Sequence, residues 1–347
     1  MTFPAARERA ISMVAAATST DMPEAAYFEH LSGKHLLVTG ALGFLGSSVV
    51  ASLARADCEI TRFVRRESRA PRSTHATVVD IVGDVRDRAA WRRALDGVDV
   101  VIHLAAQTSA ATADADPAAD FEANVTPVHA LLEACCAKRD PTTVLLAGSV
   151  TQAGVTHAIP VNEAHDDRPA TTYDRHKLMA EELVKRHVSL GRIRGASLRL
   201  ANLYGPGPRS SGADRGVLNA MVRRAAAGEP LTIYGHGRFL RDYLHVGDAA
   251  AAFVAAAARI DAIDGRHFVV GSGVGCTIAE AFQLVAERAQ AKTRHAVKVR
   301  HVEPRTPLSD LERRNFVADT TRFTQATGWR ACRSLAEGID ETLEAFL

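Results

Sequence analysis

The sequence has few cysteines, little net charge and no histidine cluster. Its 5 cysteines include no CxxC pair and are odd in number, which argues against a disulfide framework and for a reducing compartment. A formal net charge of +2 gives no reason to expect nucleic acid or an anionic membrane as a partner. The 14 histidines show neither an HExxH motif nor paired ligand spacing, so we predict no metal site.

Long apolar runs are also missing. The run ISMVAAA near the N-terminus is short and follows Glu8, which disfavours a signal peptide. The alanine-rich run at 249–260 is too short to span a membrane. We therefore expect a cytoplasmic protein with no membrane partner. Its composition, with 47% apolar and 24% charged residues, is that of an ordinary globular protein.

From residue 35 onward the sequence contains a regular alternation of strand-like and helix-like segments. Helical patterns begin near residue 44 and cover 87–95, 117–138 and 173–187, and strand-like apolar runs lie at 35–39, 58–64, 77–84, 99–106, 142–149 and 196–205. This alternation predicts an α/β fold, a Rossmann-type doubly wound parallel sheet with helices on both faces. Continuous apolar runs such as VVIHLAA are typical of strands buried on both faces.

The same pattern divides the chain into three parts. Residues 1–34 form an N-terminal extension, and we expect removal of residues 1 to about 30 to leave the core fold intact. Residues 35–204 contain this alternation, and we expect them to form the Rossmann-type domain. Residues 205–347 are mainly a smaller substrate-binding lobe, from which segments such as 231–234 and 268–270 could return to the large sheet.

Three glycines, Gly40, Gly43 and Gly46, lie three residues apart between a predicted strand and a predicted helix. Such a turn presents free backbone N–H groups and the positive end of a helix dipole to a phosphate, and side chains there would hold the ligand away. An ordinary tight turn would explain an isolated triplet, but the strand–turn–helix context favours a dinucleotide pyrophosphate. The predicted cofactor site includes Phe44 and Leu45 at the start of the helix.

The end of the second predicted strand bears on the choice of cofactor. An acidic residue there would accept hydrogen bonds from the adenosine ribose and favour NAD. The chain instead has Val64 followed by Arg65 and Arg66. A guanidinium can bind a 2′-phosphate in bidentate fashion, so NADP(H) is favoured and NAD(H) is the alternative. The pair could also be a solvated basic loop, and without interleaved aromatic residues it does not indicate nucleic acid binding.

The strongest chemical signal is Tyr173 followed four residues later by Lys177, because residues at this spacing share one helix face. A free phenol with a pKa near ~10 is a poor base at neutral pH. A nearby ammonium and an oxidised nicotinamide would favour the phenolate, so the pair can move a proton to or from an alcohol oxygen. An exposed helix face would show the same spacing. Ser149, at the end of the preceding strand, could bind the same substrate oxygen and orient it.

Together these motifs resemble the extended short-chain dehydrogenases/reductases, the NAD-dependent epimerase/dehydratase group acting on nucleotide sugars. The resemblance runs from about residue 35 to the C-terminus and includes TGALGFLG, GDVRD, HLAAQTS, LRLANLYGPG and IYGHGRFLRDYLHVGDAA. It implies that Asp84 and Val85 flank the adenine and that Lys177 holds the nicotinamide ribose. It also implies that the cofactor's ribose and phosphates are lined by Leu104, Ala105 and Ala106.

The resemblance further implies a nucleoside-diphosphate sugar as substrate and a set of residues that bind it. Ser149 and Thr108 lie near the sugar, Asn202 and Arg241 face the diphosphate, and Thr232 and Tyr234 lie near the base, with Arg305 or Arg313 closing over the phosphates. The apolar helical face at 121–135 is the region that forms a homodimer interface in this family, although burial within the fold would give the same pattern.

Two departures from the family pattern shape the functional prediction. Dehydratases carry an Asp-Glu pair after the catalytic hydroxyl, where this chain has Val150 and Thr151, so dehydration is disfavoured. Val64 replaces the acid through which epimerases retain NAD, which favours NADPH-dependent reduction of an NDP-4-keto-6-deoxyhexose. An NDP-hexose 4-epimerase, similar to UDP-glucose 4-epimerase, is the alternative. Two further alternatives are a non-catalytic NADP-binding regulator and a reductase of small non-sugar ketones.

Overall fold

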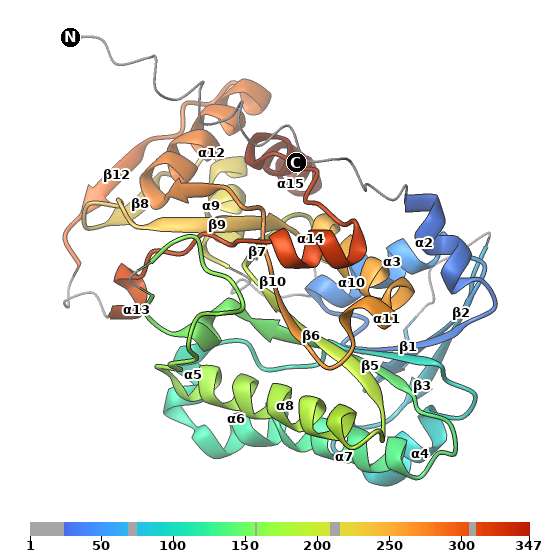
Figure 1. Cartoon of the computed structure of the whole chain (residues 1–347). Helices are drawn as coiled ribbons and strands as arrows, with labels where there is room; N and C mark the ends of the chain where they lie inside the picture. The colour runs from blue at the N-terminus through green and yellow to red at the C-terminus, as the bar shows by residue number, and fades with distance from the viewer. Residues whose placement is uncertain (1–23, 69–74, 157, 209–215, 305–309) are drawn as a thin grey trace.

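The computed structural model describes residues 24–68, 75–156, 158–208, 216–304 and 310–347. Within these residues the main sheet has seven parallel strands in the order β10-β6-β5-β4-β1-β2-β3 (Figure 1). Its strands are β1 (His35–Thr39), β2 (Glu59–Val64), β3 (Thr77–Val82), β4 (Val100–His103), β5 (Thr143–Ser149), β6 (Arg194–Leu200) and β10 (His267–Val270). The predicted Rossmann-type parallel sheet is confirmed.

Helices cover both faces of this sheet. One layer contains α2 (Glu24–Leu31), α3 (Phe44–Leu53), α10 (Val246–Ala258), α11 (Ile260–Ile263) and α14 (Thr321–Thr327). The other contains α4 (Arg88–Ala94), α5 (Ala110–Ala115), α6 (Pro117–Asn124), α7 (Thr126–Cys136) and α8 (Thr172–Ser189). Leu36 and Val38 of β1 are buried in the apolar core between the sheet and the first helix layer, and Leu37 is buried in the core between the sheet and the second layer. Because successive strand side chains point to opposite faces, a strand covered on both sides reads as an unbroken apolar run.

The predicted helix at 117–138 is divided in two. Its first part, α6, ends at Asn124, and α7 begins at Thr126 with Pro127 in its first turn. Proline lacks a backbone N–H but is compatible with the first turn of a helix, so it starts a new helix more readily than it continues an old one. The predicted cap of α4 is present, because Asp87 accepts a hydrogen bond from the Ala89 N–H at 2.8 Å.

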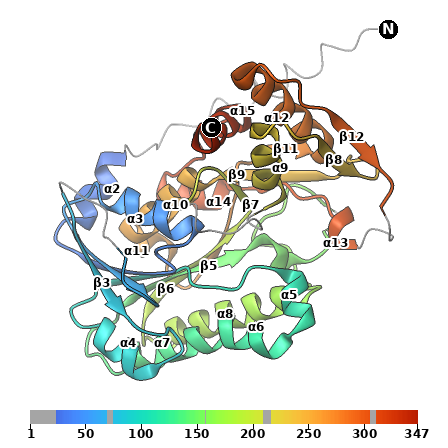
Figure 2. The ribbon, with the colours of Figure 1, turned by 180° about the vertical axis from the view of Figure 1, so that it is seen from behind.

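The second lobe is assembled from small sheets and helices (Figure 2). β11 (Gly275–Thr277), β9 (Leu240–His245) and β7 (Asn202–Tyr204) form one sheet, and β12 (Val299–Val302) pairs with β8 (Leu231–Tyr234) in another. Three helices pack around a separate apolar core: α9 (Val217–Ala226), α12 (Ile278–Thr293) and α15 (Leu335–Phe346). A further short helix, α13, spans Asp310–Arg313. Of the two candidate returning segments, 268–270 joins the main sheet as part of β10, and 231–234 does not.

The N-terminal helix α2 corrects the expected boundary of the core. Tyr27 and Leu31 are buried in the same apolar cluster as α3 and α10, with exposed fractions of 6% and 1%. The Tyr27 hydroxyl also donates a hydrogen bond to the Thr327 carbonyl oxygen at 2.9 Å. Removal of residues 1 to about 30 would take Tyr27 out of this cluster, and its effect on the core fold stays a prediction. The expected domain limits at 34 and 204 remain predictions. None of the described helices combines the length and apolarity needed to cross a membrane.

Candidate active site

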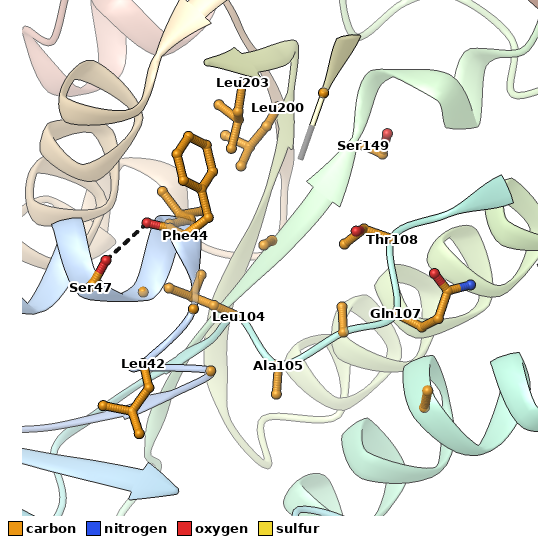
Figure 3. A pocket seen from close by; sticks show the side chains of 18 of the residues that line it. Leu42, Phe44, Ser47, Leu104, Ala105, Gln107, Thr108, Ser149, Leu200 and Leu203 are labelled. Carbon is orange, nitrogen blue, oxygen red and sulfur yellow. Dashed lines mark hydrogen bonds between the residues drawn. The ribbon is translucent and has the colours of Figure 1, made fainter. Parts of the chain in front are cut away.

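A continuous cleft of about 2150 Å³ runs from the carboxyl end of the main sheet into the second lobe. Figure 3 shows Leu42 and Phe44 on the glycine-loop side of this pocket, and Thr108 and Ser149 on the side across from it. Leu104 and Ala105 lie between them, directly after β4. The carboxyl edge of a parallel sheet is where open α/β folds bind ligands.

The cleft contains most of the residues predicted from the sequence. Those predicted for the cofactor all line it: Gly40, Gly43, Phe44, Leu45, Gly46, Arg65, Arg66, Asp84, Val85, Leu104, Ala105, Ala106 and Lys177. The predicted substrate residues that line it are Thr108, Ser149, Asn202, Thr232, Tyr234 and Arg241, and Tyr173 lies in it as well. Each residue's role remains a prediction.

Two glycines of the glycine loop stand where the surrounding backbone leaves no room for a Cβ. Gly40 has a φ of 64°, and a Cβ there would lie 2.8 Å from the Ala105 nitrogen. A Cβ on Gly46 would collide with the Gly40 carbonyl group. Gly43 is the N-cap residue of α3, and because glycine has no side chain, no side-chain hydrogen bond caps the helix. The N-terminal amides of this helix therefore face the cleft, as a pyrophosphate requires.

A buried pair that the sequence analysis did not identify supports the floor of this loop. Thr39 Oγ1 accepts hydrogen bonds from the Leu104 N–H at 3.0 Å and the Ala105 N–H at 3.1 Å, and it lies 3.0 Å from His103 Nδ1. Burial, and then the charge of Lys177, lower the pKa of His103 to about 3, so the imidazole is neutral. With both lone pairs of Thr39 Oγ1 occupied, its hydroxyl donates to Nδ1, which places the ring proton on Nε2.

The end of the cleft that is predicted to hold the adenosine is polar, and most of its charged side chains are exposed. Val64 is buried at the end of β2, and the exposed side chains of Arg65, Arg66 and Glu67 follow it along the cleft. The Asp84 carboxylate accepts hydrogen bonds from Arg86, which lower the pKa of Asp84 below its usual range. The sequence analysis did not consider Glu67, the carboxylate nearest in sequence to the two arginines.

The three predicted catalytic side chains converge from β5 and α8. Tyr173 and Lys177 lie one turn apart on α8, which begins with a capping box between Thr171 and Asp174. Ser149 ends β5, and its hydroxyl lies 2.8 Å from Thr151 Oγ1. All of these residues except the helix cap line the cleft, so the arrangement brings a hydroxyl, a phenol and an ammonium to one place.

Burial determines the protonation states of this group. It raises the pKa of Tyr173 well above its usual range, as does the Asp174 charge, while a hydrogen bond with Ser149 lowers it. Burial lowers the pKa of Lys177 to about 8, against the attraction of Glu181 and Asp120. In the protein alone Tyr173 is therefore a neutral phenol, and a further positive charge is needed before it can act as a base.

The half of the cleft that is predicted to bind the substrate is held together by hydrogen bonds between distant segments. Arg241 Nη2 donates to the Glu312 carbonyl oxygen at 2.7 Å, and its Nη1 donates to the carbonyl oxygens of Leu240, at 2.9 Å, and Arg314. Asn202 Nδ2 donates to the Asp242 carbonyl oxygen at 3.1 Å. Burial lowers the pKa of Arg241, although the group remains a cation. These contacts hold the Arg241 guanidinium, which lines the cleft, in place.

The prediction that Arg305 or Arg313 closes over the phosphates can be compared with the structure only at Arg313. Arg305 lies outside the described residues, and Arg313 is exposed at the end of α13 and does not line the cleft. Arg314, which the sequence analysis passed over, is instead buried beside Arg241. Its Nε and Nη1 have no hydrogen-bond partner within the described structure. Burial, and then the Arg241 charge, lower the pKa of Arg314 to about 10.

In the part of the chain that the structure describes, no group of three or more histidine, cysteine, aspartate or glutamate side chains could hold a metal ion. The fold and the cleft define a dinucleotide-dependent enzyme, with a serine, a tyrosine and a lysine in position for proton transfer beside the nucleotide site.

Comparison with known proteins agrees with this class. The NAD dependent epimerase/dehydratase family matches residues 36–271, and the chain belongs to this family. It is 30% identical to the UDP-glucose 4-epimerase of Mycolicibacterium smegmatis, a match that covers 89% of this chain and 97% of that protein.

Solved structures of the same kind are similar over nearly the whole fold. The UDP-glucose 4-epimerase of Thermotoga maritima with UDP-glucose matches with a TM-score of 0.78 and 26% identity, covering 90% of this chain and 98% of that one. The UDP-glucose 4-epimerase of Thermus thermophilus in complex with NAD has a TM-score of 0.75 and 27% identity over the same shares of the two chains. The chain is thus an enzyme of the extended short-chain dehydrogenase/reductase type.

Proposed function

We propose that this enzyme is a nucleoside-diphosphate-hexose 4-epimerase, similar to UDP-glucose 4-epimerase. The observation that carries the proposal is one continuous cleft lined by the glycine loop, by Ser149, Tyr173 and Lys177, and by Arg241. The similarity to UDP-glucose 4-epimerases over 89% of the chain supports the same conclusion. The comparisons favour this alternative over the NADPH-dependent reduction that the sequence analysis preferred.

The reductase prediction depended on Arg65 and Arg66, which lie at the adenosine end of the cleft. Residues there choose between forms of the cofactor, but they do not touch the sugar carbon whose hydride is transferred. The two residues after Ser149 are Val150, which is buried, and Thr151, whose hydroxyl is hydrogen-bonded to the Ser149 hydroxyl. Neither can act as an acid or base in the elimination of water, so dehydration remains disfavoured.

The residues of this chain act on the proton of the sugar hydroxyl. Ser149 holds the hydroxyl oxygen, and Tyr173 takes its proton as the C–H bond breaks and a ketone forms. A nicotinamide bound in this cleft would supply the positive charge that lowers the pKa of Tyr173 and would act as acceptor and donor of the hydride. Once the ketosugar has turned over, Tyr173 gives the proton back to the same oxygen, so the residues of the chain end the cycle in the state in which they began it.

We also propose that Arg65 and Arg66 favour a 2′-phosphorylated cofactor, NADP(H), with NAD(H) as the alternative. Both side chains line the cleft directly after β2. The last residue of β2, where a ribose-binding acid would stand, is Val64. Glu67 lines the same region and is the residue that would favour NAD. The proposed epimerase chemistry is independent of this choice, since the 2′-substituent is far from the reacting ring.

The test is to incubate the purified protein with UDP-glucose or UDP-galactose and no added cofactor, with Tyr173→Phe as the control. Interconversion of the two sugars by the wild type, together with NAD or NADP in the protein's bound fraction by mass spectrometry, would support the proposal. Stoichiometric loss of added NADPH with an NDP-4-keto-6-deoxyhexose, and no interconversion of epimers, would restore the reductase.

A further inference from the structure

A fully buried glutamine lies behind the catalytic group, and the mechanism above does not use it. Gln152, with an exposed fraction of 0%, lies in the short turn Val150–Ala153 directly after Ser149. Its Oε1 accepts a hydrogen bond from the Ser149 backbone N–H at 2.8 Å. Its Nε2 donates to Glu181 Oε2 at 3.1 Å. The amide therefore connects the end of β5 to the middle of α8.

Glu181 is held so firmly that it determines which way the amide of Gln152 points. Arg199 of β6 donates to both of its oxygens, at 2.6 and 3.0 Å, and Lys185 lies 2.8 Å away. Burial raises the pKa of Glu181, but the hydrogen bonds and charge of Arg199 outweigh this effect and bring it to about 2. A carboxylate only accepts hydrogen bonds, so the NH₂ end of Gln152 faces Glu181 and its oxygen faces Ser149.

The two elements joined by this amide carry the whole predicted catalytic group. Glu181 lies one turn of α8 beyond Lys177 and two turns beyond Tyr173. We propose that Gln152 is a positioning residue, which holds Ser149 in register with Tyr173 and Lys177 through Glu181. This inference rests on the catalytic roles given above to Ser149, Tyr173 and Lys177.

A carboxamide is the one common side chain of this length that can accept at one end and donate at the other. Gln152→Met fills the same space but leaves the Ser149 N–H and one Glu181 oxygen unpaired. Gln152→Glu places two acceptors against each other, and both contacts can be restored only if the two carboxylates share a proton. The charged or titratable groups facing Glu181 are Lys177 and Lys185 of α8, Arg199 of β6 and His267 of β10, with Asp167 beyond Arg199.

The experiment measures kcat and KM of Gln152→Glu and Gln152→Met relative to wild type across pH, with the cofactor bound. Because a misplacement of about 1 Å can cost roughly 100-fold in rate, we expect both variants to lose about 10- to 100-fold in kcat at neutral pH, with KM little changed. The ratio of Gln152→Glu to wild-type kcat should rise as the pH falls from about 8 towards 6, as the shared proton binds, since a buried glutamate can titrate that high. The ratio for Gln152→Met should stay flat.

The matched control is Gln283→Glu, because Gln283 Nε2 donates to Glu287 Oε1 at 2.9 Å on the exposed side of α12. It makes the same chemical change beside a glutamate and should leave kcat at the wild-type value at every pH. A wild-type kcat in Gln152→Met, or a pH-independent ratio for Gln152→Glu, would overturn the proposal. A variant that is simply misfolded would not regain activity on acidification.

A second measurement does not depend on the identity of the sugar. Amide hydrogen exchange of the cofactor-bound protein should show faster exchange of the Ser149 amide in Gln152→Met than in wild type, with Gln283→Glu unchanged. Equal protection of that amide in Gln152→Met would show that Gln152 does not hold Ser149, and the proposal would be wrong. If the wild type shows no epimerase activity, the proposed function fails, and the exchange rates still decide the role of Gln152.

Discussion

The two halves of the cleft are built in different ways. In the cofactor half, backbone approaches the ligand site directly, as at Gly40 and Gly46, where no side chain would fit. In the substrate half, side chains form the wall, most of them apolar, such as Met221 and Phe239. The Arg241 guanidinium among them is held in place by carbonyl oxygens of Leu240, next to it in the chain, and of Arg314, far from it in the chain.

This difference matches what each half recognises. A dinucleotide pyrophosphate is the same in every member of such a family, so backbone amides and a helix N-terminus can bind it without a specific side chain. A sugar nucleotide varies in base and sugar, and side chains can be changed one at a time. We expect mutations in the first half to affect every substrate alike, and mutations in the second to change affinity for the sugar nucleotide alone.

The largest effect is expected where the two halves meet. Tyr173→Phe removes the transferable proton and should lower turnover by about 10²–10⁴-fold, the usual contribution of a general acid or base. Cofactor affinity, measured by fluorescence titration, should stay close to the wild-type value because the ring still fills its place. Undiminished turnover would contradict the assignment of Tyr173.

Arg241→Met tests the independence of the substrate half. Loss of a charge-assisted hydrogen bond to a diphosphate is worth about 1.5–3 kcal/mol, so affinity for a nucleoside diphosphate should fall roughly 10- to 150-fold by calorimetry. Affinity for the cofactor should not change. Arg238→Met, at an exposed position three residues earlier, is the matched control. An equal loss of cofactor affinity would show that the two halves are coupled.

The basic pair at the adenosine end tests the cofactor half. Changing Arg65 and Arg66 together to alanine should weaken NADP(H) by about one to two decades, from the loss of a charge-assisted hydrogen bond, and should affect NAD(H) much less. The exposed pair Arg92 and Arg93 of α4, changed in the same way, should have no effect on either. Equal losses for both cofactors, or none, would make the pair an ordinary solvated loop.

The smallest effect is expected outside both halves. Tyr27→Phe removes the hydrogen bond from α2 to Thr327 and should lower the free energy of unfolding by about 1 kcal/mol. For a chain of 347 residues that corresponds to roughly 1–2 °C in Tm by calorimetry, with turnover and both affinities unchanged. Unchanged stability would show that the hydrogen bond between Tyr27 and Thr327 does not stabilise the fold.

Sequence reasoning succeeded where the signal is local. The glycine loop, the Asp87 cap and the spacing of Tyr173 and Lys177 can each be recognised within a few residues of chain, because helix and turn geometry determines which neighbours meet. It was wrong about the single helix at 117–138, although Pro127 was a visible signal for the break. It also placed the start of the core too late, since nothing near Tyr27 shows that its partner is Thr327, 300 residues away.

By itself, the sequence determined the family, the parallel sheet and the identity of the groups that could bind a phosphate and move a proton. Only the tertiary structure decided that Arg314 and not Arg313 is buried beside Arg241, that 231–234 pairs with β12, and that Gln152 reaches Glu181. The physical reason is that backbone hydrogen bonds and helix dipoles act between near neighbours in sequence. A buried side chain instead takes its partner from whichever distant element packs against it, and no local pattern records that choice.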